Sequence, residues 1–259
     1  MFDYLIPSVE GEKIFRELLP RQNAEDLLRF AATGTHVLNG YHNPKHELGV
    51  VYWAYSCAIN SQSYEPRGNE CNWLNINDEV ELVISALFHD HNHSGGVTTD
   101  DINVERARNF VKGARMRSAL PACISSHHLS QNIACTQFHK GTFQFAPDTF
   151  TRKCLRDADL MSIYSHEGRC LLVHLFGSEL NVDLTSDLKL REALQKNADF
   201  LRTHEMFTPF GQAVKSQYLE ESLKKFERHV WSTLRPHPPI TLLNSPIGNF
   251  QVNSLDENS

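Results

Sequence analysis

One short segment of the chain carries an unusual density of metal-binding side chains. The segment His89-Asp90-His91-Asn92-His93 places three imidazoles and one carboxylate within five residues, directly after an apolar helical pattern. Side chains of successive residues diverge where a helix ends, so His89 and Asp90 can reach one ion from different directions. Imidazole binds Zn, Fe, Ni or Mn, while carboxylate favours Mn, Mg or Fe. The pattern therefore predicts a site for a divalent metal.

The other interpretation of this segment is a polar loop in which the histidines hydrogen-bond backbone carbonyls. Buried polar groups without partners are costly, so four of them close together favour one shared ion as their partner. His93 follows His89 by four residues and returns to the same side, so we expect it inside the site. We expect His91 either behind the ligands or exposed to solvent.

A second group of candidates flanks the expected start of a helix. In Tyr41-His42-Asn43-Pro44-Lys45-His46, Asn43 is a good N-cap and Pro44 suits the first helical position, which predicts a helix over 44–59. His46 lies in the first turn of this helix and His42 just before its cap. Two histidines that flank one helix N-terminus can face the same cleft.

Two carboxylates stand in the middle of a further helical pattern, Arg156-Asp157-Ala158-Asp159-Leu160. Aspartate is a poor helix former, so at least one of them should face a cation or an arginine. Side chains two residues apart are separated by about 200° around a helix, so only one of the two can point into the site. Three more histidines, His127, His128 and His139, either complete a second metal site or are ordinary loop residues.

The remaining sequence predicts helices and no strand of useful length. The helix that leads into His89 has apolar residues at helical spacing and a capping-box pattern from Asp78 to Glu81. Asn23 and Asp148 are residue types that favour the N-cap position, and the segment Thr98-Thr99-Asp100-Asp101 is expected to cap a further helix. Other helices are expected at 10–19, 23–32, 148–161, 187–203 and 211–234, and the polar segment 61–75 is expected to be a loop. We therefore predict an all-α, compact helical bundle.

Size and charge limit the kinds of partner. The chain of 259 residues predicts one domain over residues 1–235, with a metal-site core at about 40–165 and an extended tail at 236–259. The net charge of −6 gives no reason to expect binding to nucleic acid or to an anionic membrane. An anionic substrate would need local positive charge, which a metal centre can supply.

Cysteine usage and hydropathy indicate the compartment. The six cysteines form no CxxC pair, which is typical of reduced thiols in a cytosol-like compartment. The sequence shows neither a secretory signal nor a run of eighteen apolar residues. We therefore expect a cytoplasmic protein that contacts no membrane.

The ordered set of His46, His89-Asp90 and a helical Asp159 resembles the HD superfamily of metal-dependent phosphohydrolases. The resemblance covers about residues 40–165 and implies that these four residues bind a divalent metal. Asp159 matches the family's carboxylate of an Ala-Asp pair, which leaves Asp157 a structural role. Within the superfamily, the segments 41–46 and 89–95 are similar to the signatures of cyclic-nucleotide phosphodiesterases.

That closer resemblance implies roles for two more histidines. His42 matches the histidine that protonates the leaving oxygen, and His93 matches one at the dinuclear centre and its bridging water. The segment 206–210 also resembles bacterial relatives. Ser94 stands where the family has a proline, a family asparagine a few residues further on is out of register, and no glutamine that reads a purine can be assigned, with Gln212 and Gln217 the only candidates.

The sequence therefore predicts a metal-dependent phosphodiesterase that hydrolyses a nucleotide phosphodiester, with a cyclic nucleotide as the expected substrate. The expected cofactor is a pair of divalent ions, Mn, Mg, Zn or Fe. One alternative is an HD-type phosphohydrolase that acts on nucleoside mono- or triphosphates. Another is an HD-type di-iron oxygenase, which the additional histidines would suit, and a third is a nucleotide-binding module without catalysis.

Overall fold

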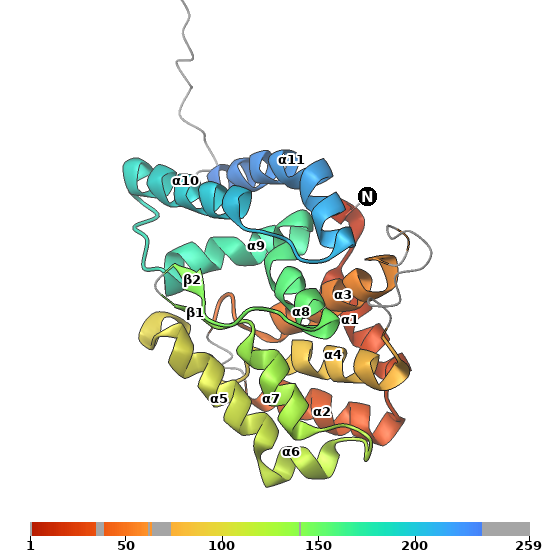
Figure 1. Cartoon of the computed structure of the whole chain (residues 1–259). Helices are drawn as coiled ribbons and strands as arrows, with labels where there is room; N and C mark the ends of the chain where they lie inside the picture. The colour runs from red at the N-terminus through yellow and green to blue at the C-terminus, as the bar shows by residue number, and fades with distance from the viewer. Residues whose placement is uncertain (1, 35–38, 62, 64–73, 140, 235–259) are drawn as a thin grey trace, which may run out of the picture.

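Helices make up most of the described chain, which confirms the prediction of an all-α protein (Figure 1). The structure is a computed structural model, and it describes residues 2–34, 39–61, 63, 74–139 and 141–234. The predicted tail at 236–259 and most of the predicted loop at 61–75 lie outside these residues. Within them, no helix is both long enough and apolar enough to cross a membrane.

The centre of the fold is α3 (Pro44–Ser61), which packs against α1 (Pro7–Leu18), α4 (Ile76–Phe88) and α8 (Phe150–Leu160). Apolar side chains occur on nearly all sides of α3, as expected for a helix surrounded by others. Its fully buried residues include Val50, Val51, Trp53, Ala54 and Cys57. The central helix therefore fixes the positions of α4 and α8, the other two helices that deliver the predicted ligands.

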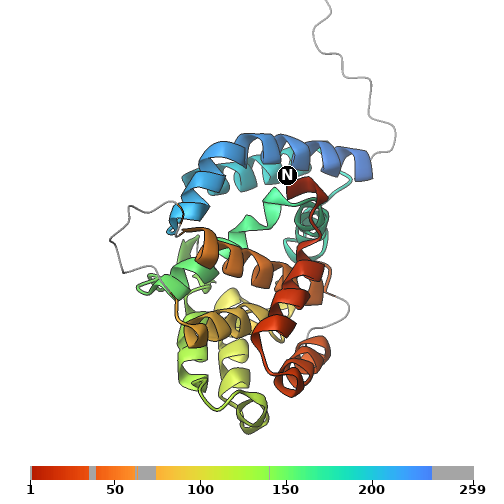
Figure 2. The same ribbon diagram turned by 90° about the vertical axis from the view of Figure 1, so that its right-hand side faces the viewer.

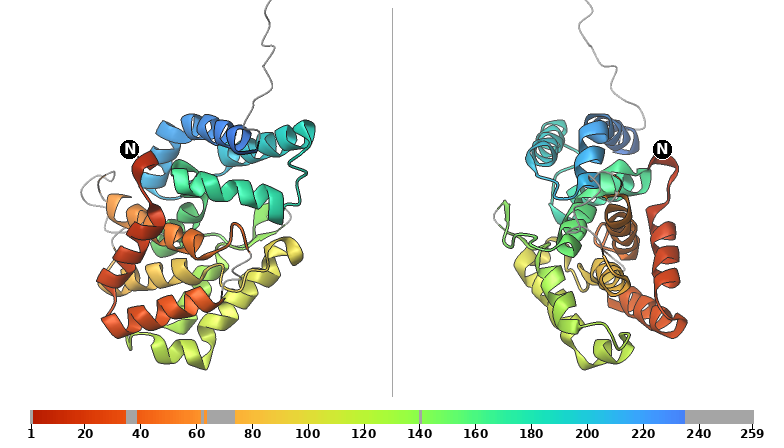
Figure 3. Two further views of the ribbon diagram at one scale, coloured as in Figure 1. Left: turned by 180° about the vertical axis from the view of Figure 1, so that it is seen from behind. Right: turned by 45° about the vertical axis from the view of Figure 1, so that its right-hand side comes forward.

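Four helices form a lower layer in the view of Figure 1: α2 (Arg21–Gly34), α5 (Asp100–Lys112), α6 (Ala114–Ala119) and α7 (Ser126–Ala134). Helix α5 packs along α7, and α7 packs on α4. The view from behind in Figure 3 shows the same arrangement, with α2 and α6 at the end of the molecule far from α11. Through α7, this layer packs against α4, the helix that leads to His89 and Asp90.

The upper layer contains the second half of the chain after α8. It consists of the short turn η5 (Met161–Tyr164), α9 (His166–His174), one π-helical turn η6 (Leu175–Glu179), α10 (Asp187–Thr203) and α11 (Pro209–Leu234). Figure 2 shows that the N-terminal segment, which begins with η1 (Phe2–Tyr4), reaches up to α11. The sequence analysis predicted α10 and α11 but not α9 or η6.

A small hairpin interrupts the helices between α7 and α8. Strands β1 (Phe138–His139) and β2 (Thr142–Phe143) pair antiparallel, with Phe138 opposite Phe143. Two residues are too few to show the alternation of apolar and polar residues on which strand prediction depends. The sequence predicted no strand here, so the hairpin brings two aromatic rings together without a signal in the sequence pattern.

Several helix starts differ by a few residues from the prediction, whereas the starts of α3 and α10 are confirmed. Asn43 Oδ1 accepts hydrogen bonds from the backbone N–H groups of Lys45 and His46, as an N-cap should. The prediction that Asp78 caps α4 is wrong, because Asn75 is the N-cap and Asp78, the third residue of the helix, completes the capping box with it. Likewise Asn23 lies inside α2, and Thr149 rather than the adjacent Asp148 caps α8.

The two carboxylates of α8 face different surroundings, as the 200° separation predicts. Asp157 is fully buried and accepts hydrogen bonds from the backbone N–H groups of Phe207 and Thr208 and from the Thr208 hydroxyl. Burial raises the pKa of Asp157 to about 6, and these hydrogen bonds limit the rise. A Cβ on Gly211 would lie 2.5 Å from Asp157 Oδ2, so only glycine fits there. Asp157 therefore anchors the start of α11.

We predict that Asp157→Ala lowers the free energy of unfolding by about 3 kcal/mol, because it leaves buried N–H and O–H donors without an acceptor. Urea denaturation of the metal-free protein would measure the change. The control is Asp148→Ala. Asp148 lies just before α8, and the substitution removes its solvent-exposed ion pair with Arg152 of that helix, which should cost less than about 1 kcal/mol. Equal losses in the two variants would contradict the anchoring role of Asp157.

Candidate metal centre

Four predicted ligands converge from three helices. His46 comes from the first turn of α3, His89 and Asp90 follow the last residue of α4, and Asp159 stands near the end of α8. His89 Nε2 lies 2.9 Å from Asp90 Oδ2 and 3.5 Å from Asp159 Oδ1. His46 Nε2 lies 3.2 Å and 3.5 Å from the same two oxygens. The four ligand atoms lie within 4.8 Å of one another, which suits one shared cation.

His89 has the tautomer expected of a metal ligand. His89 Nδ1 lies 2.7 Å from the carbonyl oxygen of Ala86, so Nδ1 carries the proton and donates it. The lone pair of Nε2 then points at the two carboxylates. The Nε2 atoms of His46 and His89 are both buried and have no hydrogen-bond partner. Buried nitrogens of this kind need a cation, either a proton or a metal ion.

The pKa values show which cation balances the carboxylates when no metal is bound. Burial opposes charge, but the histidines hold the pKa of Asp90 and Asp159 well below the usual range. Against the same burial, the two carboxylates raise the pKa of His46 and, more strongly, of His89. The cluster therefore draws protons onto its imidazoles, and a divalent ion can replace them.

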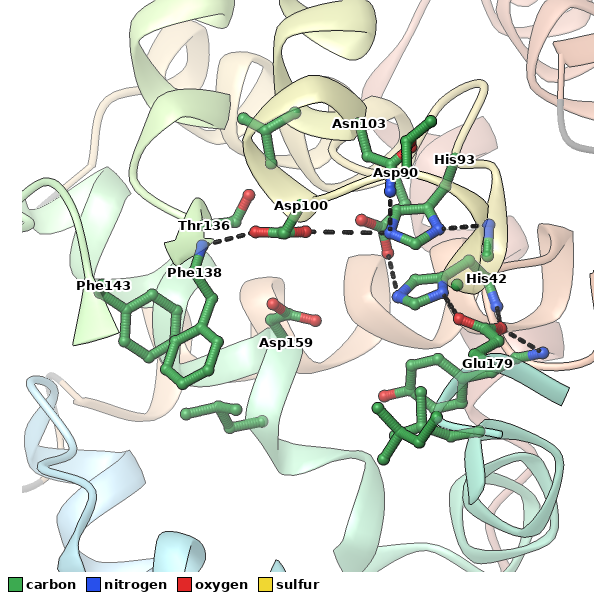
Figure 4. Close-up of a pocket in the computed structure, with 18 of the residues that line it drawn as sticks. His42, Asp90, His93, Asp100, Asn103, Thr136, Phe138, Phe143, Asp159 and Glu179 are labelled. Carbon is green, nitrogen blue, oxygen red and sulfur yellow. Dashed lines mark hydrogen bonds and ion pairs between the residues drawn. The ribbon is translucent and has the colours of Figure 1, made fainter. Parts of the chain in front are cut away.

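A cavity of about 340 Å³ opens beside the cluster (Figure 4). One end of it holds the carboxylates and histidines, and the other holds an aromatic wall built by Phe138, Phe143 and Phe200. Its polar lining includes Asp90, Asp100, Asp159 and Glu179, and none of the described lining residues is lysine or arginine. An anion could enter this cavity only if cations occupied the acidic end.

His42 lines the cavity with one ring nitrogen directed into it. Its Nδ1 donates a hydrogen bond to Glu179 Oε2, and its Nε2 lies 3.8 Å from Asp90 Oδ2. Glu179 Oε1 accepts from the backbone N–H groups of Tyr41 and His42 as well, so the carboxylate is fixed. Burial lowers the pKa of His42, while Asp90 and Glu179 oppose that decrease. The arrangement holds one tautomer of His42 in one orientation.

His93 supports His42 from the other side. The two rings stack with centroids 3.5 Å apart. Gly95 N–H donates to His93 Nδ1, and the Asn103 amide lies 3.1 Å from Nε2, so both ring nitrogens have neighbours in the protein. His42, Asp90 and His93 also place ligand atoms within 4.8 Å of one another, where a second cation could bind. That binding would require His93 to exchange one of its present contacts.

The other histidines singled out in the sequence lie elsewhere. Of the two alternatives for His91, exposure to solvent is wrong, because the ring is buried against Phe110, with ring centroids 3.8 Å apart, and burial lowers its pKa to about 4. His127 and His128 are exposed on α7, and His139 lies beside Asp101. Among the described residues, none of these three joins a group of potential metal ligands.

Sequence analysis missed three polar residues near the site. Glu179 is distant in sequence and comes from η6, where a Cβ on Gly96 would lie 2.1 Å from its carbonyl oxygen. Asn103 belongs to α5 and accepts hydrogen bonds from Ser94. Glu47 follows His46 and is fully buried, and neither of its carboxylate oxygens has a hydrogen-bond partner. Only Glu47 had a signal, since its helical pattern places a carboxylate among apolar residues.

Comparison with known proteins does not assign a family to this geometry. No protein-family model matches the sequence, and no curated protein is significantly similar to it. The chemistry of the converging residues therefore carries the functional argument.

We predict that Asp159→Asn weakens binding of a divalent metal at least about 100-fold, because loss of a hydrogen-bond partner behind a ligand already costs 10–100-fold. Calorimetry with Mn²⁺ or Zn²⁺ would measure the affinity. In the unmodified protein the affinity should fall as pH falls below the raised pKa values of His46 and His89, by up to about 100-fold per pH unit when two protons compete.

The matched control for this experiment is Asp157→Asn on the same helix, which should keep the affinity for metal. The ligand assignment would be wrong if the Asp157 variant lost the ion and the Asp159 variant retained it.

We predict that Glu47→Gln removes a pH-dependent loss of stability. Burial raises the pKa of Glu47 from 4.5 to about 8, so between these values the folded state keeps a proton that the unfolded chain has released. The stability contributed by Glu47 is therefore complete below pH 4.5 and declines as pH rises to about 8. Urea denaturation of the metal-free proteins should show the variant gaining on the original chain by up to about 1.4 kcal/mol per pH unit.

Glu105→Gln, on the solvent-exposed face of α5, is the control and should show no such trend. A difference between Glu47→Gln and the original chain that stays constant from pH 5 to pH 8 would mean that Glu47 is ionised in the folded protein.

Proposed function

We propose that the protein is a metal-dependent phosphodiesterase of the HD type, and that its substrate is a cyclic nucleotide. The observation that carries the proposal is the convergence of His46, His89, Asp90 and Asp159 in one buried cluster beside a cavity. The same residues carry the resemblance to HD phosphohydrolases. A divalent ion held by this cluster would supply positive charge to a phosphodiester and increase the acidity of a water molecule.

His42 is placed to handle the proton that such a reaction needs. An alkoxide that leaves a phosphodiester is strongly basic and must be protonated as it departs. His42 Nε2 faces the cavity, while the Nδ1–H is held by Glu179. The proton on Nε2 can therefore move to the leaving oxygen, and Glu179 stabilises the protonated ring before that transfer and keeps its orientation throughout.

The shape and charge of the cavity support a small nucleotide. Its volume of about 340 Å³ is at the lower end of the range for sites that bind small molecules. Phe138, Phe143 and Phe200 form a face on which a nucleobase can stack. A cyclic nucleotide has one negative charge, which fits a cavity whose described lining has no lysine or arginine.

The alternatives have less support. A nucleoside triphosphate brings several negative charges that the cavity lining would repel. The di-iron oxygenase depended on additional histidines as ligands, and His127, His128 and His139 lie apart from the cluster. Hydrolysis of a phosphate ester with His42 as the proton donor would use both the acidic end and the aromatic end of the cavity.

We predict that His42→Ala lowers turnover of a cyclic nucleotide by about 10²–10⁴-fold, the usual contribution of a general acid, while metal content stays unchanged. Activity would be measured over a panel of cyclic mono- and dinucleotides with Mn²⁺, Mg²⁺, Zn²⁺ or Fe²⁺ added. The same variant should retain most of its activity on a nitrophenyl phosphodiester, whose leaving group needs no proton.

Equal losses on the two kinds of substrate would rule out the proton-donor role. Activity confined to nucleoside triphosphates would replace the proposed substrate and leave the metal ligands in place. Oxygen consumption by an iron-loaded protein without phosphate ester hydrolysis would instead favour the oxygenase.

A further inference from the structure

A second group of metal-binding side chains lies where α9 meets α11, away from the cavity described above. His166 is the first residue of α9, Cys170 stands one turn later, and His229 comes from α11. Cys170 Sγ lies 3.5 Å from His166 Nε2, and the rings of His166 and His229 have centroids 5.4 Å apart. One ligand atom from each residue lies within 4.8 Å of the other two.

The charged neighbours of this group are turned to other partners. Glu167 accepts hydrogen bonds from the backbone N–H and hydroxyl of Ser8. Arg169 donates to the carbonyl oxygen of Ile163 and to Asp3, and Lys225, one turn before His229, also binds Asp3. No carboxylate among the described residues joins the group. The two imidazoles and the thiol therefore face one another without a competing salt bridge.

The donor set selects the class of metal. A thiolate and two imidazoles are the ligands of Zn²⁺ in proteins, whereas Mg²⁺, Ca²⁺ and Mn²⁺ favour oxygen ligands. Three protein ligands leave one tetrahedral position for water, and exposed His166 gives access from solvent.

We propose that His166, Cys170 and His229 bind one Zn²⁺ ion and thereby link α9 to α11. Binding releases the Cys170 thiol proton to solvent, because the thiolate is the form that binds the metal. The zinc link also lies on the segment of chain that leads to the cavity. Helix α9 continues into η6, whose last residue is Glu179, the partner of His42. Zinc therefore fixes the first turn of the segment that holds Glu179.

Cobalt substitution tests this site separately from the candidate metal centre, because this group contains a cysteine and, among the described residues, the candidate metal centre contains none. The full-length, metal-free protein is titrated with Co²⁺, and the near-ultraviolet thiolate-to-cobalt absorption band is followed. We expect one equivalent of cobalt at this site, with the band removed when excess Zn²⁺, enough to fill the candidate metal centre as well, displaces it. Cys170→Ser and His229→Ala should abolish the band, and Cys123→Ser, which changes an exposed cysteine outside the group, should retain it.

Thermal denaturation with and without Zn²⁺ provides the second measurement. Both the original chain and Cys170→Ser gain stability from zinc at the candidate metal centre, so the additional rise in the original chain reports this site alone. At about 100 times the Kd, we expect that additional rise in Tm to be about 5–10 °C. Absence of the cobalt band in folded original protein, or its persistence in Cys170→Ser, would overturn the proposal, as would equal rises in Tm for both proteins.

Discussion

The attraction between two carboxylates and two buried imidazoles is the interaction on which the organisation of this protein depends. Asp90 and Asp159 would repel each other without a cation between them, and the Nε2 atoms of His46 and His89 have no other partner. Removing any one of these groups leaves buried charge without compensation, which is costly in an apolar interior. The helices α3, α4 and α8 must therefore end or begin at the same place, and the close packing of α3 against the other two enforces this.

The residues around the cluster give the two ends of the cavity different chemical character. The acidic end of the cavity contains the candidate ligands and holds His42 in one orientation through Glu179, whereas the aromatic end provides an apolar face without charge. A second carboxylate on α8, two residues before Asp159, has a different role. Asp157, on the opposite side of α8 from Asp159, accepts hydrogen bonds from Phe207 and Thr208 and joins α8 to α11. One helix thus serves both the site and the packing of the upper layer.

The upper layer contributes to the site through its connection to Glu179. Helix α9 begins at His166, beside Cys170 and His229, and leads directly into the π-helical turn that ends at Glu179. Movement of that turn would change how His42 is held, since Glu179 binds both the imidazole and the adjacent backbone. The contact between α9 and α11 therefore lies on the same continuous segment as Glu179, the carboxylate that orients His42.

The sequence by itself determined the helical class and the fact that only one of Asp157 and Asp159 can face the site, because helix periodicity, capping and the 100° step per residue are local properties. The choice of Asp159 came from the resemblance to the HD superfamily and not from periodicity. It placed helix starts less well, since several polar residues compete for each cap and tertiary contacts decide among them, as with Asn75 in place of Asp78. Only the tertiary structure decided that Glu179 holds His42 and that His91 is buried. These depend on which helices pack together across long sequence separations, and no local pattern encodes that packing.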